Sequence, residues 1–379
     1  MAVDPTNFKH QLTAVNDLTS TATVYESFDR GLTWTNAGLS GLPFSYDTWL
    51  AFNAVGDEFV SYECSDERIA YKKVGQTTWT KTTLVAGSFP DRDMATVDRT
   101  STSPHYGAVY IGYDDNGNNN SAQVMYSANG FGSWTKSPKI NDGNPTIGVN
   151  AAVGPDGTVY ATWEDFNGKK IWTDKSTNGG ATWGTDHVVT NYRINTTSFF
   201  ISIPPQPDRG VLPMPMTATA PAGTACAGRL YVTYLDKSTT GSNTNIYERY
   251  SDNGGSTWSS EIQVNDGSTT AYHFHPAISV SPNGTVGISF YDTRNDATNK
   301  KTDQYAASST NCGVSWSANQ KVTTAMSDES GPGDPNDYGD YQGISAAVTS
   351  TGLNFFQGVW TDSRVGNKNE DMETASWKP

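Results

Sequence analysis

The side chains of this sequence that could do acid–base chemistry are carboxylates and tyrosines in short loops beside apolar runs. Asp47 and Asp93 each precede such a run, Glu164 follows one, and Tyr341 lies in an acidic loop late in the chain. Two carboxylates flanking a glycosidic bond, one donating a proton and one serving as base or nucleophile, can hydrolyse that bond. We predict that these four residues are catalytic. The alternative for Glu164 is a solvated strand end.

Three arginines lie in comparable loops. Arg92 stands between Asp91 and Asp93, while Arg294 and Arg364 each come two residues after an aspartate. A guanidinium can bind a carboxylate through two parallel hydrogen bonds, so these arginines are predicted to bind an anionic group of a substrate. The alternative is that they form structural ion pairs with neighbouring acids.

His273 and His275 lie two residues apart, a spacing that points both to one side of an extended strand. With Tyr338 or Tyr341 and an arginine, they could run lyase chemistry on a uronate. A histidine would abstract the C5 proton, the arginine would neutralise the carboxylate and the tyrosine would protonate the leaving oxygen. The alternatives are a packed, hydrogen-bonded histidine pair and a metal site, but no third ligand has recognisable spacing.

Aromatic side chains in the same loops could stack on sugar rings. They are Tyr46, Trp49, Tyr272 and Tyr341, and a glycan-binding protein without catalysis would use them as platforms. Tyr46, Trp49 and Tyr338 are therefore predicted, together with the three arginines, to bind substrate.

An octet of the form Ser-x-Asp/Asn-x-Gly-x-Thr/Ser-Trp recurs along the chain and indicates what positions these residues. Its clear copies are Ser27–Trp34, Ser176–Trp183, Ser251–Trp258 and Ser309–Trp316, and degenerate copies end at Trp79 and Trp134. In each copy Asp or Asn would cap a turn, Gly would supply a positive φ, and Trp would pack between neighbouring sheets.

This octet resembles the Asp box, or bacterial neuraminidase repeat, of the sialidase-like β-propellers. The resemblance covers the repeats over nearly the whole chain. It implies a tyrosine nucleophile at Tyr341, activated by Glu164, with Asp47 or Asp93 as acid/base. It also implies an arginine triad at Arg92, Arg294 and Arg364. The Arg-Ile-Pro motif that sialidases carry near the first blade is absent, so the resemblance does not extend to the active site.

A second repeat predicts the blades themselves. Aromatic and β-branched strands ending in an acid recur at Phe59–Glu63, Val109–Asp114, Val159–Glu164, Leu230–Asp236, Val286–Asp292 and Phe355–Asp362, each after another short apolar strand. We predict an all-β fold, a single seven-bladed propeller of four-stranded antiparallel blades, with six blades as the alternative. The predicted blades are approximately 1–44, 45–90, 91–143, 144–195, 196–270, 271–333 and 334–379.

Propeller topology sorts the polar residues. If strand A of each blade lines the central channel, the D–A and B–C loops share one face and the octets lie on the other. The candidate residues then converge on one funnel, where a substrate site is expected. The insert Pro204–Pro215 could overhang this funnel as a lid, or form a bent strand A of the fifth blade.

Composition excludes several classes of protein. The 379 residues carry a net charge of −14, so the basic footprint of a nucleic-acid binder is missing. No apolar run is long enough for a membrane-spanning helix. Cys64, Cys226 and Cys312 lie far apart, and three buried thiols are favoured over one disulfide with a free thiol.

We expect a secreted or cell-surface monomer whose partner is a glycan or polysaccharide. No cofactor is expected, although the acidic loops Asp114–Asn120 and Asp334–Asp337 are rich enough in oxygen for structural calcium. The primary functional prediction is a sialidase-like glycoside hydrolase. The alternatives are a uronate-cleaving polysaccharide lyase and a non-catalytic binding propeller, because propellers host unrelated activities.

Overall fold

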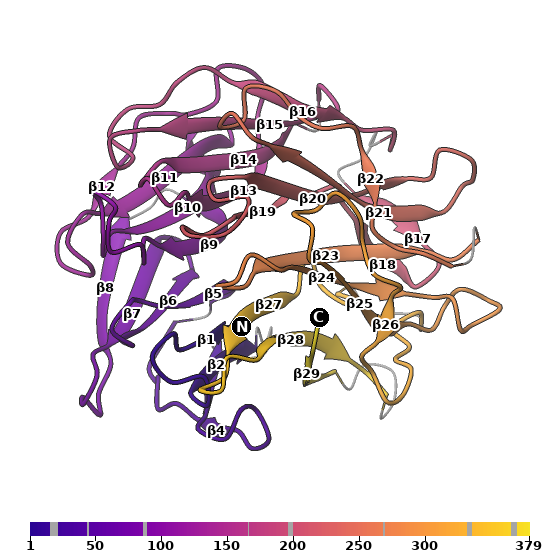
Figure 1. The fold of residues 1–379 in the computed structure, drawn as a ribbon, viewed down its shortest axis with the longest axis horizontal. Coiled ribbons are helices and arrows are strands. Elements are labelled where there is room, and N and C mark those ends of the chain that lie inside the picture. Colours follow the sequence, from indigo (N-terminus) through magenta and orange to yellow (C-terminus); the bar gives the residue numbers. More distant parts are fainter. Residues whose placement is uncertain are drawn as a thin grey trace.

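The computed structural model describes residues 1–15, 22–43, 45–85, 89–165, 167–195, 200–267, 270–331, 336–364 and 370–379. These residues form seven antiparallel sheets of three or four strands arranged around a centre, together with one separate two-stranded hairpin (Figure 1). The fold is therefore an all-β, seven-bladed propeller, which confirms the predicted class and count.

Within the described ranges, six blades have four strands and the last has three. The strands are, blade by blade, β1 (Ala2–Val3), β2 (Gln11–Val15), β3 (Thr23–Ser27) and β4 (Thr35–Asn36); β5 (Tyr46–Phe52), β6 (Glu58–Glu63), β7 (Glu67–Lys72) and β8 (Thr80–Val85); β9 (Pro90–Val97), β10 (Val109–Asp115), β11 (Ser121–Ser127) and β12 (Thr135–Lys136); β13 (Ile147–Val153), β14 (Val159–Asp165), β15 (Lys170–Ser176) and β16 (His187–Asn191); β19 (Met216–Thr219), β20 (Leu230–Lys237), β21 (Thr244–Ser251) and β22 (Ile262–Gln263); β23 (His273–Val280), β24 (Val286–Asp292), β25 (Asp303–Ser309) and β26 (Gln320–Lys321); β27 (Gly343–Val348), β28 (Asn354–Asp362) and β29 (Asp371–Trp377).

The hairpin consists of β17 (Ile201–Ile203) and β18 (Gln206–Val211), and a single 3₁₀ turn, η1, spans Asn116–Asn118 among the described residues. The acid-ending strands predicted from the sequence correspond to β6, β10, β14, β20, β24 and β28, with ends that differ by at most one residue. Their burial explains this agreement, because β6, β10, β14 and β24 are buried along their whole length and read as continuous apolar or aromatic runs.

The first strand of each blade lies at the centre, and neighbouring first strands contact one another in the order β1, β5, β9, β13, β19, β23, β27 and back to β1. The N-terminal strand β1 pairs with β2 of its own blade, so the two ends of the chain supply different blades. Ring closure therefore depends on packing between the first and last blades. The Val3 amide donating to Ser345 Oγ at 3.2 Å is one such contact.

The octets form the turns between the third and fourth strands. In the first, Thr33 N and Thr33 Oγ1 donate to the Asp29 carboxylate at 2.9 and 2.6 Å, and Gly31 N donates to Ser27 Oγ at 2.8 Å. In the copies at Asn178, Asn253 and Asn311 the side-chain oxygen accepts the same backbone bond. The side-chain bond is reversed there, because the Asn Nδ2 donates to the Thr or Ser hydroxyl at 2.8 Å. The role predicted for Asp or Asn is thereby confirmed.

The first octet also packs against the last blade, which is the neighbour of the first blade in the ring. A Cβ on Gly31 would lie 3.1 Å from Gln357 Nε2 of β28, so this octet brings the first blade against the last. Its tryptophan does the same, because Trp34 Nε1 donates to Thr374 Oγ1 of β29 at 3.3 Å. This contact agrees with the predicted place of tryptophan between neighbouring sheets and shows how it helps close the ring.

Cys226 and Cys312 form a disulfide that joins the fifth blade to the octet of the sixth, and Cys64 is free. The preferred sequence expectation of three buried thiols is therefore wrong, because residues 86 positions apart are brought together by neighbouring blades. A structural disulfide is consistent with an extracellular protein. Among the described residues, no helix is long and apolar enough to cross a bilayer.

Candidate functional site

Four inner strands carry the same irregularity where they enter the funnel. In β5, β9, β13 and β23 the register against the second strand shifts by one residue, as in a β-bulge. The first bulged residues are Asp47, Arg92, Gly148 and His275, and all have positive φ, between 44° and 70°. Non-glycine residues in this conformation are strained, and bulges re-aim side chains next to functional sites. Three of these four residues, Asp47, Arg92 and His275, are among the site residues that the sequence predicts.

A cavity of about 1110 Å³ occupies the centre of the propeller. Residues from loops and inner strands of several blades line it, including Tyr46, Asp47, Trp49, Glu63, Phe89, Asp91, Asn150, Arg209, Asp340 and Tyr341. This is a volume that suits a small molecule or a few sugar residues.

Three carboxylates converge on this cavity. Asp47, Glu63 and Asp91 each offer an oxygen atom, and these atoms all lie within 4.8 Å of one another. The Tyr341 hydroxyl donates to Asp47 Oδ1 at 2.7 Å, and the Arg92 amide donates to Asp47 Oδ2 at 3.3 Å. Asp47, Glu63 and Asp91 are called the acidic cluster below.

Burial and mutual repulsion raise the pKa of two members of the acidic cluster, Glu63 and Asp47. Burial raises the pKa of Glu63 far above its usual range, and the charges of Asp47, Asp93 and Asp91 raise it further. Burial followed by the charge of Asp91 likewise raises the pKa of Asp47. Burial and Asp47 raise the pKa of Tyr341, so its phenol stays protonated. Of the three carboxyl groups, Glu63 is thus the one that holds its proton at neutral pH.

An Arg–Asp–Arg arrangement lies beside the cluster. Asp340 accepts from Arg92 Nη2 at 2.9 Å and from Arg209 Nε at 2.8 Å, and Arg209 Nη2 also contacts it. Arg92 is only 2% exposed, whereas Arg209 reaches the cavity. Both guanidiniums lie over the ring of Phe200, at 5.7 and 4.9 Å from its centroid.

The hairpin β17–β18 brings Arg209 to this place. The Asp208 and Arg209 amides donate to Asp337 Oδ2 at 2.9 and 2.8 Å, and Gln206 Nε2 donates to the Gly339 carbonyl at 2.9 Å. The insert Pro204–Pro215 therefore contributes a hairpin bound to the loop before β27, while strand A of the fifth blade is the separate β19.

Gly148 occupies the bulge position of the fourth blade because of Met214. A Cβ on Gly148 would lie 2.3 Å from Met214 Cγ, and Met214 Sδ in turn contacts Arg92 Nη1 at 3.9 Å. The missing side chain thus makes room for a residue that packs against the buried arginine.

Equivalent carboxylates in three consecutive blades have different surroundings. Glu63, Asp114 and Glu164 each face the residue just before a bulge. Asp114 accepts from Thr146 Oγ1 at 2.5 Å and Gly148 N at 2.6 Å, and Glu164 accepts from the Tyr192 hydroxyl at 2.9 Å. Burial raises the pKa of Asp114 to about 7 and that of Glu164 to about 8. Glu63 lines the cavity, whereas Glu164 is fully buried behind it.

The remaining predicted acid, Asp93, is the second bulged residue of β9 and is fully buried. Burial followed by the charge of Glu67 raises its pKa well above the usual range. Asp93 therefore influences the cluster from behind rather than facing the cavity.

The two histidines have different surroundings, whereas their spacing predicts that they share one side of the strand. His273 Nδ1 lies 3.0 Å from the Thr244 carbonyl and Nε2 lies 3.2 Å from Asp292 Oδ2, and both of these side chains are fully buried. His275 Nε2 lies 3.2 Å from Gln206 Oε1. The bulge at His275 breaks the two-residue alternation on which the expectation rested.

The other predicted binding residues have varied environments. Arg294 pairs with Asp292 and Asp266, and Arg364 with Asp362, so the three predicted arginines are not gathered at one point. Tyr338 is fully buried, its hydroxyl 2.9 Å from Thr302 Oγ1.

Tyr46 and Trp49 line the cavity with Tyr341, and the Trp49 and Tyr341 ring centroids are 5.8 Å apart. The structure thus brings three of the predicted aromatic residues together with Asp47.

The sequence-based predictions missed Glu63, Arg209 and the role of Asp340. Glu63 ends one of the predicted acid-ending strands, so the signal is present but does not distinguish it from Glu164. Arg209 lies in a proline-rich insert with no repeat to place it, and nothing in the sequence indicates its contact with Asp340.

In the loops suggested for calcium, Asp114 and Asp337 accept hydrogen bonds from groups of the protein itself. Asp114 binds Thr146 and Gly148, and Asp337 binds two amides of β18. Asp334 lies outside the described residues.

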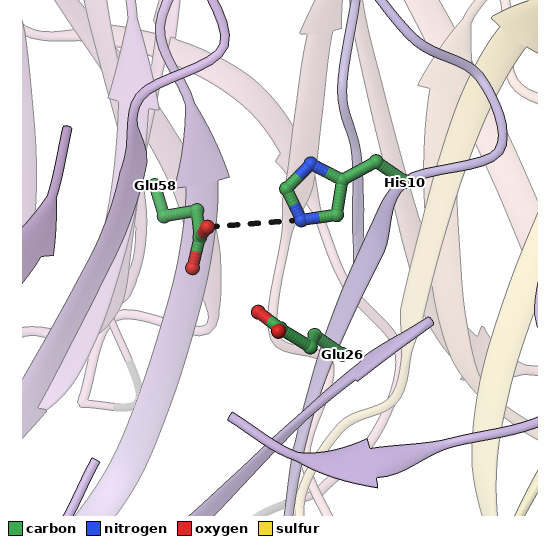
Figure 2. Close-up of side chains that lie close together, drawn as sticks. All are labelled: His10, Glu26 and Glu58. Carbon is green, nitrogen blue, oxygen red and sulfur yellow. Dashed lines mark ion pairs between the residues drawn. The ribbon is translucent and has the colours of Figure 1, made fainter. Parts of the chain in front are cut away.

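A second group of potential metal ligands lies between the first two blades, away from the cavity. Figure 2 shows His10, Glu26 and Glu58 turned toward one another, with His10 Nε2 3.7 Å from Glu58 Oε1. The Lys72 ammonium lies 2.9 Å from both Glu26 Oε2 and Glu58 Oε2. A cation of the protein itself therefore already neutralises these acids, and the group is an ion-pair network that joins two blades.

No protein-family model matches this chain, and no curated protein is similar to it in sequence. Solved structures with the same fold include an α-L-arabinanase from Penicillium chrysogenum complexed with arabinobiose, at 13% identity and a TM-score of 0.53, over 89% of this chain and 94% of that one. An ulvan lyase of polysaccharide lyase family PL25 has 13% identity and a TM-score of 0.50, over 87% and 84%. An α-L-arabinofuranosidase from Fusarium graminearum has 13% identity and a TM-score of 0.50, over 88% and 93%. At this identity the likeness establishes the propeller fold, which these carbohydrate-active proteins share.

Proposed function

We propose that this protein is a glycoside hydrolase whose reaction centre is the acidic cluster in the central cavity. The observation that carries the proposal is the convergence of Asp47, Glu63 and Asp91, with oxygen atoms within 4.8 Å of one another on the wall of a ligand-sized cavity. Retaining hydrolases place their two carboxyl groups about 5–5.5 Å apart and inverting ones about 6.5–9.5 Å apart. The close spacing favours retention of configuration.

The environments of the carboxyl groups suggest their roles. The pKa of Glu63 is raised far above its usual range, so Glu63 is the proton donor to the leaving glycosidic oxygen. Asp47 is oriented by the Tyr341 hydroxyl and the Arg92 amide, and its carboxylate attacks the anomeric carbon. Water then displaces Asp47 from the glycosyl intermediate while Glu63 takes up the proton of that water. Tyr341 is thus a positioning residue in this scheme.

The charge of the cavity favours an uncharged sugar. Among the described residues that line it, Arg209 is the only arginine, and it is already paired with Asp340. The acidic cluster and the acids around it would repel the carboxylate of a sialic acid or a uronate. The sialidase-like variant of the proposal is therefore placed behind a hydrolase of neutral glycans.

The lyase alternative depends on His275 as a base. Burial lowers the pKa of His275 to about 4, and its Nε2 is engaged by Gln206. Such an imidazole is a weak base with one nitrogen occupied, so this alternative has less support.

A panel of three substrates tests the proposal with three readouts. Arabinan, ulvan and 3′-sialyllactose are each incubated with the protein, and reducing sugar, absorbance near 235 nm and free sialic acid are measured. We expect reducing sugar from the neutral polymer. An unsaturated product from ulvan would replace the proposal with the lyase, and released sialic acid would restore the sialidase-like variant. If no product is released from these substrates or from other neutral polysaccharides, the proposed hydrolysis is contradicted.

Arg294→Ala and Arg364→Ala should each leave hydrolysis within about twofold of wild type. Each arginine neutralises a fully buried aspartate, so each loss should lower the free energy of unfolding by about 2 kcal/mol. Activity on the neutral polymer and urea denaturation measure the two effects. A large loss of activity with unchanged stability would support the sequence-based prediction that these arginines bind substrate.

A further inference from the structure

Phe89 is an exposed phenylalanine on the wall of the cavity, where its side chain contributes little to the stability of the fold. Its side chain is 59% exposed, it lines the central cavity, and its φ of 46° places it in the left-handed region. A non-glycine residue in that region is strained, and an exposed aromatic ring forgoes the stabilisation of burial. Both costs would be offset if the ring makes its contacts with a ligand in the cavity.

The backbone holds this ring beside the acidic cluster. The Phe89 carbonyl accepts from Asn116 N at 3.1 Å, and the next residue, Pro90, begins β9 and pairs with Asp115. Asp91 of the acidic cluster follows immediately. Phe89 therefore enters the cavity from an anchored point two residues from a carboxylate of the proposed reaction centre.

Tyr46 provides a second aromatic surface on the neighbouring blade. It is the first residue of β5, is 37% exposed, lines the cavity and lies directly opposite Glu63 in the strand pair. Phe89 and Tyr46 thus adjoin the acidic cluster from two consecutive blades.

We propose that Phe89 and Tyr46 form a subsite for the sugar residue next to the cleaved bond, so that the substrate is a neutral oligosaccharide or polysaccharide rather than a simple glycoside. The inference rests on the proposed function. The C–H face of an uncharged sugar ring is apolar and packs on an aromatic face, which stays exposed until ligand covers it. The nearby acids supply hydrogen-bond acceptors for the hydroxyl groups on the ring edge.

The test compares Phe89→Ala with Phe28→Ala. Phe28 is 58% exposed but lies in the first octet, on the opposite face, so its loss removes an equally exposed ring from a place remote from the cavity. On the neutral polymer, Phe89→Ala should raise KM about 10-fold with little change in kcat, because a stacking contact made equally in ground and transition states is lost. A glycosyl fluoride of the same sugar has no ring to place on Phe89, so its hydrolysis should be unaffected, and Phe28→Ala should match wild type on both substrates.

Binding separates this inference from the proposed function. Arabinotriose, xylotriose, cellotriose and mannotriose are titrated into wild type and into both variants by calorimetry, and the oligomeric state is followed by light scattering. Weaker trisaccharide binding in Phe89→Ala supports the subsite even if no polysaccharide is hydrolysed. Hydrolysis with equal KM, equal binding by both variants, or no binding to wild type would overturn it. So would an oligomer that Phe89→Ala dissociates, since Phe89 would then serve self-association.

Discussion

Glu63→Gln should reduce kcat on the neutral polymer by about 10³-fold, because the amide keeps the shape of a protonated carboxyl but has no acidic proton for the leaving oxygen. The residue lines the cavity, and burial with the charges of Asp47, Asp93 and Asp91 raises its pKa, which keeps the proton in place at neutral pH. Steady-state kinetics on the polymer, with the variant's denaturation curve as a check on folding, measures the effect.

The pH dependence of activity is a second test of Glu63 as the proton donor. Since Glu63 acts in its protonated form, wild-type activity should fall as pH rises through its elevated pKa, well above the usual range for glutamate. The residual activity of Glu63→Gln should lack this alkaline limb, because the amide does not titrate.

Glu164→Gln is the matched control. Glu164 occupies the equivalent position two blades later, is also buried, and hydrogen-bonds to Tyr192 instead of facing the cavity. We expect its activity to stay within a few-fold of wild type. If Glu164→Gln is inactive and Glu63→Gln is active, the proposed centre is misplaced by two blades and the sequence-based choice of Glu164 is restored.

This pair of residues also shows what a repeat can and cannot predict. The octets and the acid-ending strands identify the blades because each unit needs the same turn and the same buried strand. The repeat makes Glu63, Asp114 and Glu164 equivalent, since all three lie at the ends of buried strands. What differs is their partners, Thr146 for one and Tyr192 for another, and these come from loops between blades. No repeat pattern specifies such contacts.

The surroundings of the histidines and arginines were likewise not specified by the sequence pattern. The spacing of His273 and His275 predicts one face of a regular strand, but the strand has a bulge at His275 and the two rings have different partners. The three arginines look alike in sequence, yet Arg294 and Arg364 each pair with the aspartate two residues earlier, while Arg92 reaches Asp340 of another blade. The candidate site is thus assembled from positions where the chain departs from its repeat.

Asp340→Asn should destabilise the fold more than Arg294→Ala or Arg364→Ala, lowering the free energy of unfolding by about 3–5 kcal/mol. Although burial raises the pKa of Asp340, the guanidiniums of Arg92 and Arg209 outweigh it and lower the pKa to about 2. The carboxylate is therefore ionised in the folded protein at neutral pH. An amide in its place leaves Arg92, which is 2% exposed, without its closest counter-charge.

The pH dependence of stability has the same origin. A carboxyl group whose pKa is lowered on folding stabilises the protein above its unfolded pKa of about 4, and this contribution is lost as pH falls toward about 2. Wild type should therefore lose stability relative to Asp340→Asn between these pH values, so the difference between them should shrink on acidification.

Asp266→Asn is the control for removing one acid from an arginine pair. Asp266 has a side chain that is 47% exposed and pairs with Arg294 at 2.7 Å, and exposed pairs of this kind contribute less than about 1 kcal/mol. Urea denaturation of the three proteins near pH 7 and near pH 3 measures both effects. Equal losses in the two variants would mean that water reaches Arg92 and compensates for Asp340. The wall of the cavity would then be far more open than the burial of Arg92 indicates, and the low local dielectric that the proposed chemistry at the acidic cluster relies on would be lost with it.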